Sequence, residues 1–190
     1  MEMKTHERNE QNRMDTNEIV SSIGVQTELY LDELTNLSMD QLCRKPDDNA
    51  WSLGQMMVHL MNSARFMQLS NVDACRDASN PAVHVGGAKT DRGEEAFRVG
   101  SFPPIQIQVP PSPQYTPAQP ESKEEIRAGM QDVMVRMRSV ASTLDEIPAE
   151  NTVQHPGFGY LNAKEWFQLI EMHYRHHRHQ LGRLKEFLGA

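Results

Sequence analysis

A long amphipathic segment near the C-terminal end of the chain limits the fold more than any other feature. Residues 162–188 place apolar side chains at intervals of three and four, which is the period of an α-helix that buries one face. The members of this apolar stripe are Trp166, Leu169, Ile170, Leu181, Leu184 and Leu188. A helix with one apolar face must pack against other elements, so the segment predicts one helix of a bundle.

Histidines occupy the middle of this apolar stripe. His173 and His177 are four residues apart, so their side chains lie one turn above each other on the same face. His176 lies at the edge of the stripe, and His179 points away from it. Burying two imidazoles costs free energy unless both are neutral and either hydrogen-bonded or bound to metal. The pair by itself leaves two interpretations open, a metal site or two histidines satisfied by buried polar partners.

Three earlier stretches carry the same helical period. The first begins at Asp15 or Thr16 and ends near Asn36. The second and third cover residues 51–75 and 122–147. Three of the four helices start at residue types that cap helix N-termini, and these are Ser52, Ser122 with Glu125, and Asn162 with Glu165.

Proline separates the second helix from the third. Eight of the eleven prolines lie within residues 77–121, and we expect them to exclude a helix across most of that stretch. Ile105, Ile107 and Val109 alternate with glutamine, which is compatible with a short extended piece. This segment is therefore expected to be a long crossover that also covers one mouth of the bundle.

The remaining segments are expected to be short. Residues 38–50 and 149–161 are interpreted as connectors, the first with a turn of helix over residues 38–42. Residues 1–14 carry few apolar side chains, which predicts a disordered or frayed lead. Four helices of roughly 20–27 residues, one crossover and no convincing sheet predict an all-α fold, a four-helix bundle formed by residues 15–190 as one domain.

A third histidine completes a possible ligand set. His59 adjoins the apolar stripe of the second helix, and sites in bundles are built from inward side chains of facing helices. His59 can thereby meet His173 and His177, and three histidines with one open position form the ligand set of a catalytic zinc-type site. His155 precedes a proline in a turn sequence, where a structural or exposed role is the more common one.

Composition argues against several classes of partner. A formal charge of −7 and a pI near 5.6 argue against nucleic acid and anionic membrane as partners. No apolar run approaches the ~18 residues that span a bilayer, and the polar start of the chain has no signal-peptide core. Cys43 and Cys75 form no ligand pattern, so we expect a reduced, cytoplasmic protein. The twelve methionines lie mostly at helical spacing, which favours core filling.

Three short motifs in a fixed order resemble the DinB-like superfamily of DNA-damage-inducible proteins. They are Trp51-Ser-Leu-Gly-Gln-Met-Met-Val-His59-Leu60, His155-Pro-Gly-Phe-Gly159, and Trp166 followed by His173-x-x-His-His177-Arg-x-Gln180. The resemblance extends from the first helix to the C-terminus. It implies an up-down-down-up four-helix bundle, often a homodimer, with a divalent metal, zinc or nickel, held by His59, His173 and His177. The chain departs from the commonest form of the motif at His179, where glycine is frequent.

The resemblance also implies a class of chemistry. Characterised relatives include transferases that use thiols such as bacillithiol or mycothiol, and a thiol-dependent isomerase. We therefore expect a metal-dependent S-transferase, in which a low-molecular-weight thiol becomes a thiolate and attacks an electrophilic co-substrate. Gln55 and Gln180 are candidates to orient the imidazoles.

Two alternatives remain. The first is a hydrolase in which the metal activates water, and it ranks second because Glu171 lies off the histidine face and no carboxylate base stands out. The second is a non-catalytic, stress-associated bundle that acts through dimer contacts. Unpaired apolar positions on the first helix would suit a dimer in either case.

Overall fold

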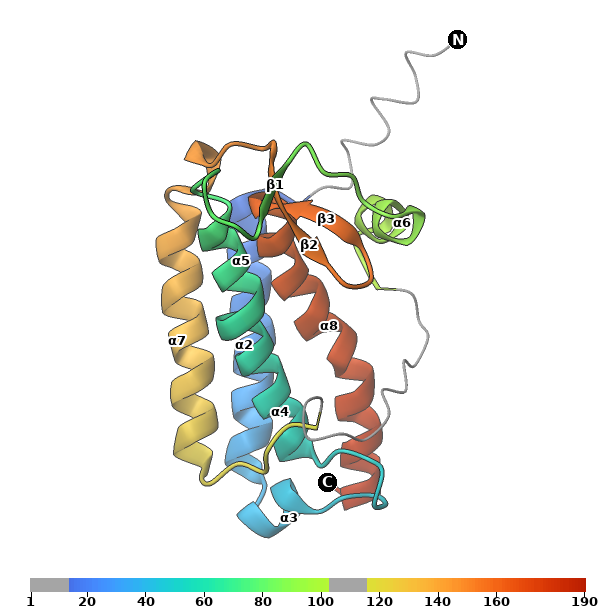
Figure 1. The fold of residues 1–190 in the computed structure, drawn as a ribbon. Helices are drawn as coiled ribbons and strands as arrows, with labels where there is room; N and C mark the ends of the chain where they lie inside the picture. Colours follow the sequence, from blue (N-terminus) through green and yellow to red (C-terminus); the bar gives the residue numbers. More distant parts are fainter. Residues whose placement is uncertain (1–13, 103–115) are drawn as a thin grey trace.

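Long helices lie side by side along one axis, with a small sheet at one end (Figure 1). The structure is a computed structural model that describes residues 14–102 and 116–190. Its long helical segments are α2 (Thr16–Asn36), α7 (Lys123–Ala141), α8 (Ala163–Leu188), and a composite helix of α4 (Leu53–Asn62), η1 (Ser63–Gln68) and α5 (Leu69–Ala74). Helix α2 packs against α7 and α8, and the composite helix packs against the same two.

Side-chain caps fix where the helices begin. In a capping box, the N-cap side chain accepts a hydrogen bond from the third helical amide, and the third side chain accepts one from the N-cap amide. Complete boxes are formed by Asp15 with Glu18, Ser38 with Gln41 at α3 (Met39–Cys43), Ser52 with Gln55, and Asn162 with Glu165. The expected box at Ser122 is one-sided, because the Glu125 carboxylate accepts from the amide of Glu121 instead.

The apolar stripes meet in one core. Trp166, Leu169 and Ile170 of α8 are buried there, as the period of the segment predicts. Most methionines of the described helices fill this core, namely Met56, Met57, Met61, Met130, Met134, Met137 and Met172. The helical class and the core-filling role of these methionines are therefore confirmed for the described residues.

The expectation of no sheet is wrong. In the part of the chain that the structure describes, β1 (Val83–Val85), β2 (Asn151–His155) and β3 (Gly159–Asn162) form an antiparallel sheet in the order β1-β2-β3. Residues 149–161, expected to be a plain connector, thus contain a hairpin, with Val153 paired to Leu161 on one side and to Val83 on the other. Strands of three to five residues are too short to show alternation above the loop background.

The proline-rich crossover also contains a helix that the sequence analysis did not predict. Helix α6 (Asp91–Val99) starts at the Thr90 cap and ends at Gly100, which has a positive φ of 69°. No proline lies between Pro81 and Pro103, so this stretch is free to be helical. The end of α7 at Ala141 is also earlier than expected, since a 3₁₀ turn, η2 (Leu144–Glu146), precedes Pro148.

Some expectations fall outside the described residues. These are the frayed lead over residues 1–13 and the extended piece at residues 105–109. Met14, the last residue of the expected lead, packs against the core. None of the helices in the described residues combines the length and apolar character that crossing a bilayer requires.

Helix α6 docks onto the turn of the hairpin. The Thr90 amide donates to the carbonyl of Phe158 at 2.9 Å, and the Tyr160 amide donates to the carbonyl of Ala88 at 3.0 Å. Gly93 lies so close to this turn that an added Cβ would overlap the Phe158 carbonyl. Because the obstacle is backbone rather than a flexible side chain, the contact requires glycine.

Gly93→Ala is expected to lower the free energy of unfolding by about 1–3 kcal/mol, because the methyl group displaces α6 from the hairpin. Gly182→Ala is the matched control, since Gly182 is exposed on α8 and no atom of the described residues lies within 4 Å of its Cβ position. That change is expected to raise stability by up to about 1 kcal/mol through helix propensity. Chemical denaturation measures both, and equal effects in the two variants would contradict the docking of α6.

Candidate metal centre

Three histidines from two helices converge at one point. His59 lies on α4, and His173 and His177 lie one turn apart on α8, 114 residues later in the chain. The Nε2 atom of His173 lies 3.0 Å from Nε2 of His59 and 3.1 Å from Nε2 of His177. One ring nitrogen from each lies within 4.8 Å of the others, so the structure brings together the three residues that the sequence selected.

Local structure sets the position of each ring. The capping box at Ser52 fixes the start of α4, and His59 follows in its second turn. The Trp51 ring, just before the cap, lies 4.9 Å from the His59 ring between centroids. On α8, the four-residue spacing places the rings of His173 and His177 4.7 Å apart. Helix phase therefore produces the cluster without any special backbone conformation on α8.

The outer nitrogens of two rings have polar partners. Gln180 Oε1 lies 2.8 Å from Nδ1 of His177, and an amide oxygen only accepts, so this Nδ1 carries the proton. Ser63 Oγ lies 3.4 Å from Nδ1 of His59. Among the described residues, none is a hydrogen-bond partner of the buried Nδ1 of His173. The His177 ring thus presents the Nε2 lone pair to the other two rings.

Gln180 contacts a ring nitrogen of His177, as expected of a side chain that orients a ligand. Gln55 makes no such contact among the described residues. The Gln55 side chain accepts from the Ser52 amide and donates to the carbonyl of Pro117, so it serves the helix cap. Sequence reasoning missed Ser63, although it follows His59 by four residues and so shares its helix face. The spacing that linked His173 to His177 would also have found Ser63.

Burial keeps the cluster neutral. It lowers the pKa of His59 to about 4 and the pKa of His177 to about 3. The charge of His59 further lowers the pKa of His177. Burial, followed by the charges of the neighbouring histidines, holds the pKa of His173 well below its usual value. Neutral imidazoles at pH 7 are the form that binds metal ions.

This donor set fits a divalent cation. Nitrogens at 2.0–2.1 Å from a tetrahedral metal stand about 3.3 Å from one another, close to the two separations that Nε2 of His173 makes here. Without a cation, the Nε2 atom of His173 would face two neighbouring nitrogens, although a neutral ring nitrogen carries either one proton or one lone pair. A cation accepts all three lone pairs at once.

Aromatic rings stand beside the cluster. The Phe102 ring lies 6.0 Å from His173 and 5.3 Å from His176, both edge-on. Phe102 also stacks on Phe158 of the hairpin turn at 5.6 Å. Together with Trp51 at His59, these contacts place apolar surface next to the nitrogens.

The other histidines have separate positions. His155 accepts hydrogen bonds at Nδ1 from the amides of Gly157 and Phe158, so it shapes the hairpin turn. His176 lies at the edge of the cluster beside Phe102, and His179 is exposed, as expected from the helix phase.

Among the residues described, no carboxylate or thiol joins the cluster. Glu171 is buried, but it pairs with Arg175 and accepts from the hydroxyl of Ser22. The carboxylate of Glu165 pairs with Lys89 near the start of α8. The placement of Glu171 agrees with its expected position off the histidine face.

Comparison with known proteins gives a family match. The model of the DinB superfamily matches residues 24–181, a span of 158 residues that includes the three histidines and the hairpin. A search of curated proteins finds no match to the chain.

Acid is expected to destabilise the metal-free protein. The pKa values of His59 and His177 lie near 4 and 3 in the folded state, but near 6.5 in the unfolded chain. Between about pH 6.5 and 4 the unfolded state therefore binds more protons, and the free energy of unfolding falls as the pH falls. The free energy of unfolding at pH 5 is expected to be lower than at neutral pH by about 2 kcal/mol for each imidazole that stays neutral in the folded state.

Urea denaturation of chelator-treated protein near pH 7.5 and pH 5 measures this loss. His59→Gln removes one of the buried rings and should weaken the pH dependence, whereas the exposed His179→Gln should leave it unchanged. Identical unfolding free energies at the two pH values would show that the rings are not held neutral.

Proposed function

The chain belongs to the DinB superfamily, and from this and the three converging imidazoles we propose that it is a metal-dependent S-transferase of low-molecular-weight thiols. The observation that carries the proposal is the approach of the Nε2 atoms of His59 and His177 to that of His173, within a cluster of three ring nitrogens. We propose these three residues as the ligands of a divalent cation, zinc or nickel. Such a cation supplies the positive charge that favours the thiolate form of a bound thiol at neutral pH.

The residues around the cluster support this chemistry. Neutral imidazoles leave the charge of a cation uncompensated, which favours binding of an anionic sulfur. Gln180 and Ser63 hold the outer ring nitrogens and so orient the rings. Trp51 and Phe102 provide apolar surface that excludes water from the sulfur and accommodates a non-polar electrophile.

The proposed reaction is a substitution at an electrophilic carbon. The thiol releases its proton to solvent, its sulfur forms the new bond to carbon, and the leaving group departs with the electron pair of the broken bond. A buried base is not required for this reaction, because the proton is lost before the attack. This agrees with the absence of a carboxylate from the cluster among the described residues.

Hydrolysis is the second candidate, because the same three nitrogens are a ligand set that serves water activation in other proteins. It ranks lower because the nearby Glu171 is already paired with Arg175. A non-catalytic, stress-associated bundle is the third outcome that the experiments distinguish. The up-down-down-up order of the long helices, a homodimer and a cytoplasmic location also belong to this proposal.

Metal binding is tested by elemental analysis of the untagged protein. We expect about one divalent cation per chain, and its loss in His59→Ala, His173→Ala and His177→Ala, because two imidazoles and water bind a cation much more weakly than three. His179→Ala is the matched control on α8 and should retain the metal. Retention of metal by His59→Ala would remove His59 from the site.

Gln180→Ala is expected to weaken metal binding about 10–100-fold, because the Nδ1 atom of His177 loses its acceptor. A competition titration with a chromogenic chelator measures the change. Gln55→Ala provides the comparison, since its side chain serves the α4 cap and should affect stability rather than metal affinity.

Activity is tested with a low-molecular-weight thiol and a chromogenic electrophile added to the metal-loaded protein. Formation of the thioether should require the metal and should be abolished in His59→Ala. A parallel panel of esters and amides tests hydrolysis. Turnover of that panel without thiol would replace the transferase by a hydrolase, and metal binding without turnover of either would favour the non-catalytic bundle.

A further inference from the structure

The helix that carries His59 changes its hydrogen-bond pattern one turn after that residue. Within η1 the pattern is that of a π-helix, and the Leu69 amide donates to the carbonyl of Ala64, five residues back rather than four. Such turns hold one extra residue and are uncommon in helices, but they are frequent at functional sites. This one lies between α4, which carries His59, and α5, which packs against α8.

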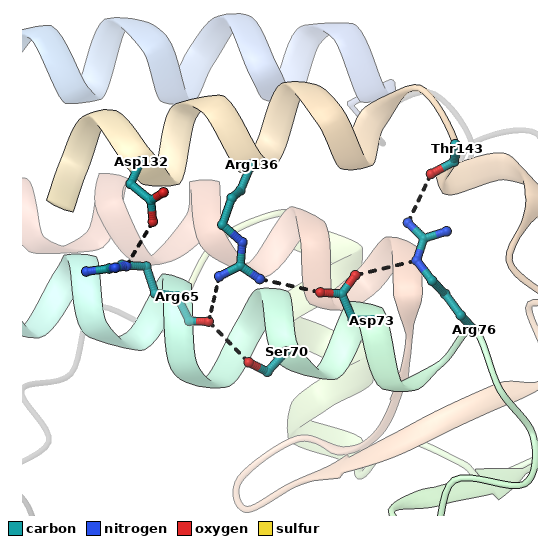
Figure 2. Close-up of polar contacts among 7 residues, drawn as sticks. All are labelled: Arg65, Ser70, Asp73, Arg76, Asp132, Arg136 and Thr143. Atoms are coloured by element: carbon teal, nitrogen blue, oxygen red, sulfur yellow. Dashed lines mark hydrogen bonds and ion pairs between the residues drawn. The ribbon is translucent and has the colours of Figure 1, made fainter. Parts of the chain in front are cut away.

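The extra residue leaves a backbone carbonyl to be satisfied by other means. Where the pattern returns from five residues to four, one carbonyl has no amide donor. Arg65 follows Ala64, and its carbonyl accepts from two side chains, Ser70 Oγ at 3.1 Å and Arg136 Nη1 at 3.1 Å (Figure 2). Ser70 belongs to the same helix, but Arg136 reaches across from α7.

Arg136 also contacts the helix that follows the π turn (Figure 2). Its Nη2 lies 3.4 Å from Asp73 of α5, whose other carboxylate oxygen contacts Arg76. The side chain of Arg65 pairs at 2.9 Å with Asp132, one turn before Arg136 on α7. Arg136 therefore joins the π turn to the helix that follows it.

The π turn determines how the two ends of the composite helix are rotated. One residue corresponds to about 100° of helical rotation, so without the insertion α4 and α5 could not both keep their present faces. Leu69 and Val72 of α5 are fully buried, while His59 of α4 faces His173. Ser63, the first residue of η1, is also the one that contacts the outer nitrogen of His59.

We propose that Arg136 is a positioning residue for the histidine cluster. By donating to the Arg65 carbonyl it stabilises the π turn, and the π turn sets His59 and Ser63 against α8. Arg136 acts through the backbone, since its hydrogen bonds go to Arg65 and Asp73 rather than to the histidines. The inference rests on the proposed function, since it concerns the same candidate metal site.

The experiment is a titration of metal-free protein with Co²⁺, followed by visible absorption. Arg136→Met should bind Co²⁺ about tenfold more weakly, within the range seen when a supporting contact of a metal ligand is lost. Its absorption bands should also differ in shape, because these bands report the geometry of the ligands. Arg136→Lys should recover part of the affinity, because one ammonium group can still donate to the carbonyl.

Arg76→Met is the matched control. Arg76 belongs to the same set of contacts, binding Asp73 and Thr143, but it does not touch the Arg65 carbonyl (Figure 2). This variant should bind Co²⁺ within about twofold of the unaltered protein. His59→Ala gives the absorption expected when the histidine cluster cannot bind Co²⁺. Hydrogen exchange of the amides of residues 63–70 in metal-free protein should accelerate in Arg136→Met and not in Arg76→Met.

The outcomes separate this inference from the proposed function. If the unaltered protein binds Co²⁺ and Arg136→Met binds it equally well, the inference is overturned and the metal site stands. Equal weakening by Arg76→Met would also overturn it, since general packing of α7 would explain the effect. If the unaltered protein fails to bind, the proposed function falls and the inference falls with it. Should Arg136→Met not fold, Ser70→Ala removes the other donor to the same carbonyl and must weaken binding if the inference holds.

Discussion

Three imidazoles packed between two helices place the strongest demands on this structure. The burial of neutral rings whose Nε2 atoms approach to 3.0 and 3.1 Å costs less free energy when a group accepts their lone pairs and polar groups bind their outer nitrogens. Gln180 and Ser63 provide the second requirement for His177 and His59. The proposed cation provides the first. The caps, the helix phases and the neighbouring aromatic rings all contribute to holding this arrangement.

The small sheet connects the crossover to the helices near this cluster. His155 accepts two amides of the hairpin turn and stacks on Phe158 at 4.6 Å, and Phe158 stacks on Phe102, which contacts His173. A row of rings thus runs from the hairpin to the candidate site. The motif from His155 to Gly159 is explained by this packing, because the imidazole serves the turn and the phenyl ring supports the aromatic surface beside the clustered histidines.

Two parts of the composite helix serve different purposes. In α4, the Ser52 cap and regular helical phase place His59, whereas α5 contributes apolar side chains to the core. The π turn allows both, and its spare carbonyl is bonded by Arg136 from α7. A feature that weakens the regular backbone hydrogen bonding of a helix is therefore stabilised by the side chains of Ser70 and Arg136. Packing in the bundle and the geometry of the site are coupled in this way.

The sequence determined the features that depend on local period and local chemistry. The spacing of apolar residues predicted the long helices, capping residues predicted most of their starts, and the interval from His173 to His177 predicted neighbouring rings. Only the tertiary structure decided the sheet, because strands as short as Val83–Val85 form when distant partners supply their hydrogen bonds. It also decided the helix Asp91–Val99, the roles of Gln55 and Ser63, and the π turn. Each of these depends on contacts between segments far apart in the chain or on hydrogen bonds that leave no period in the sequence.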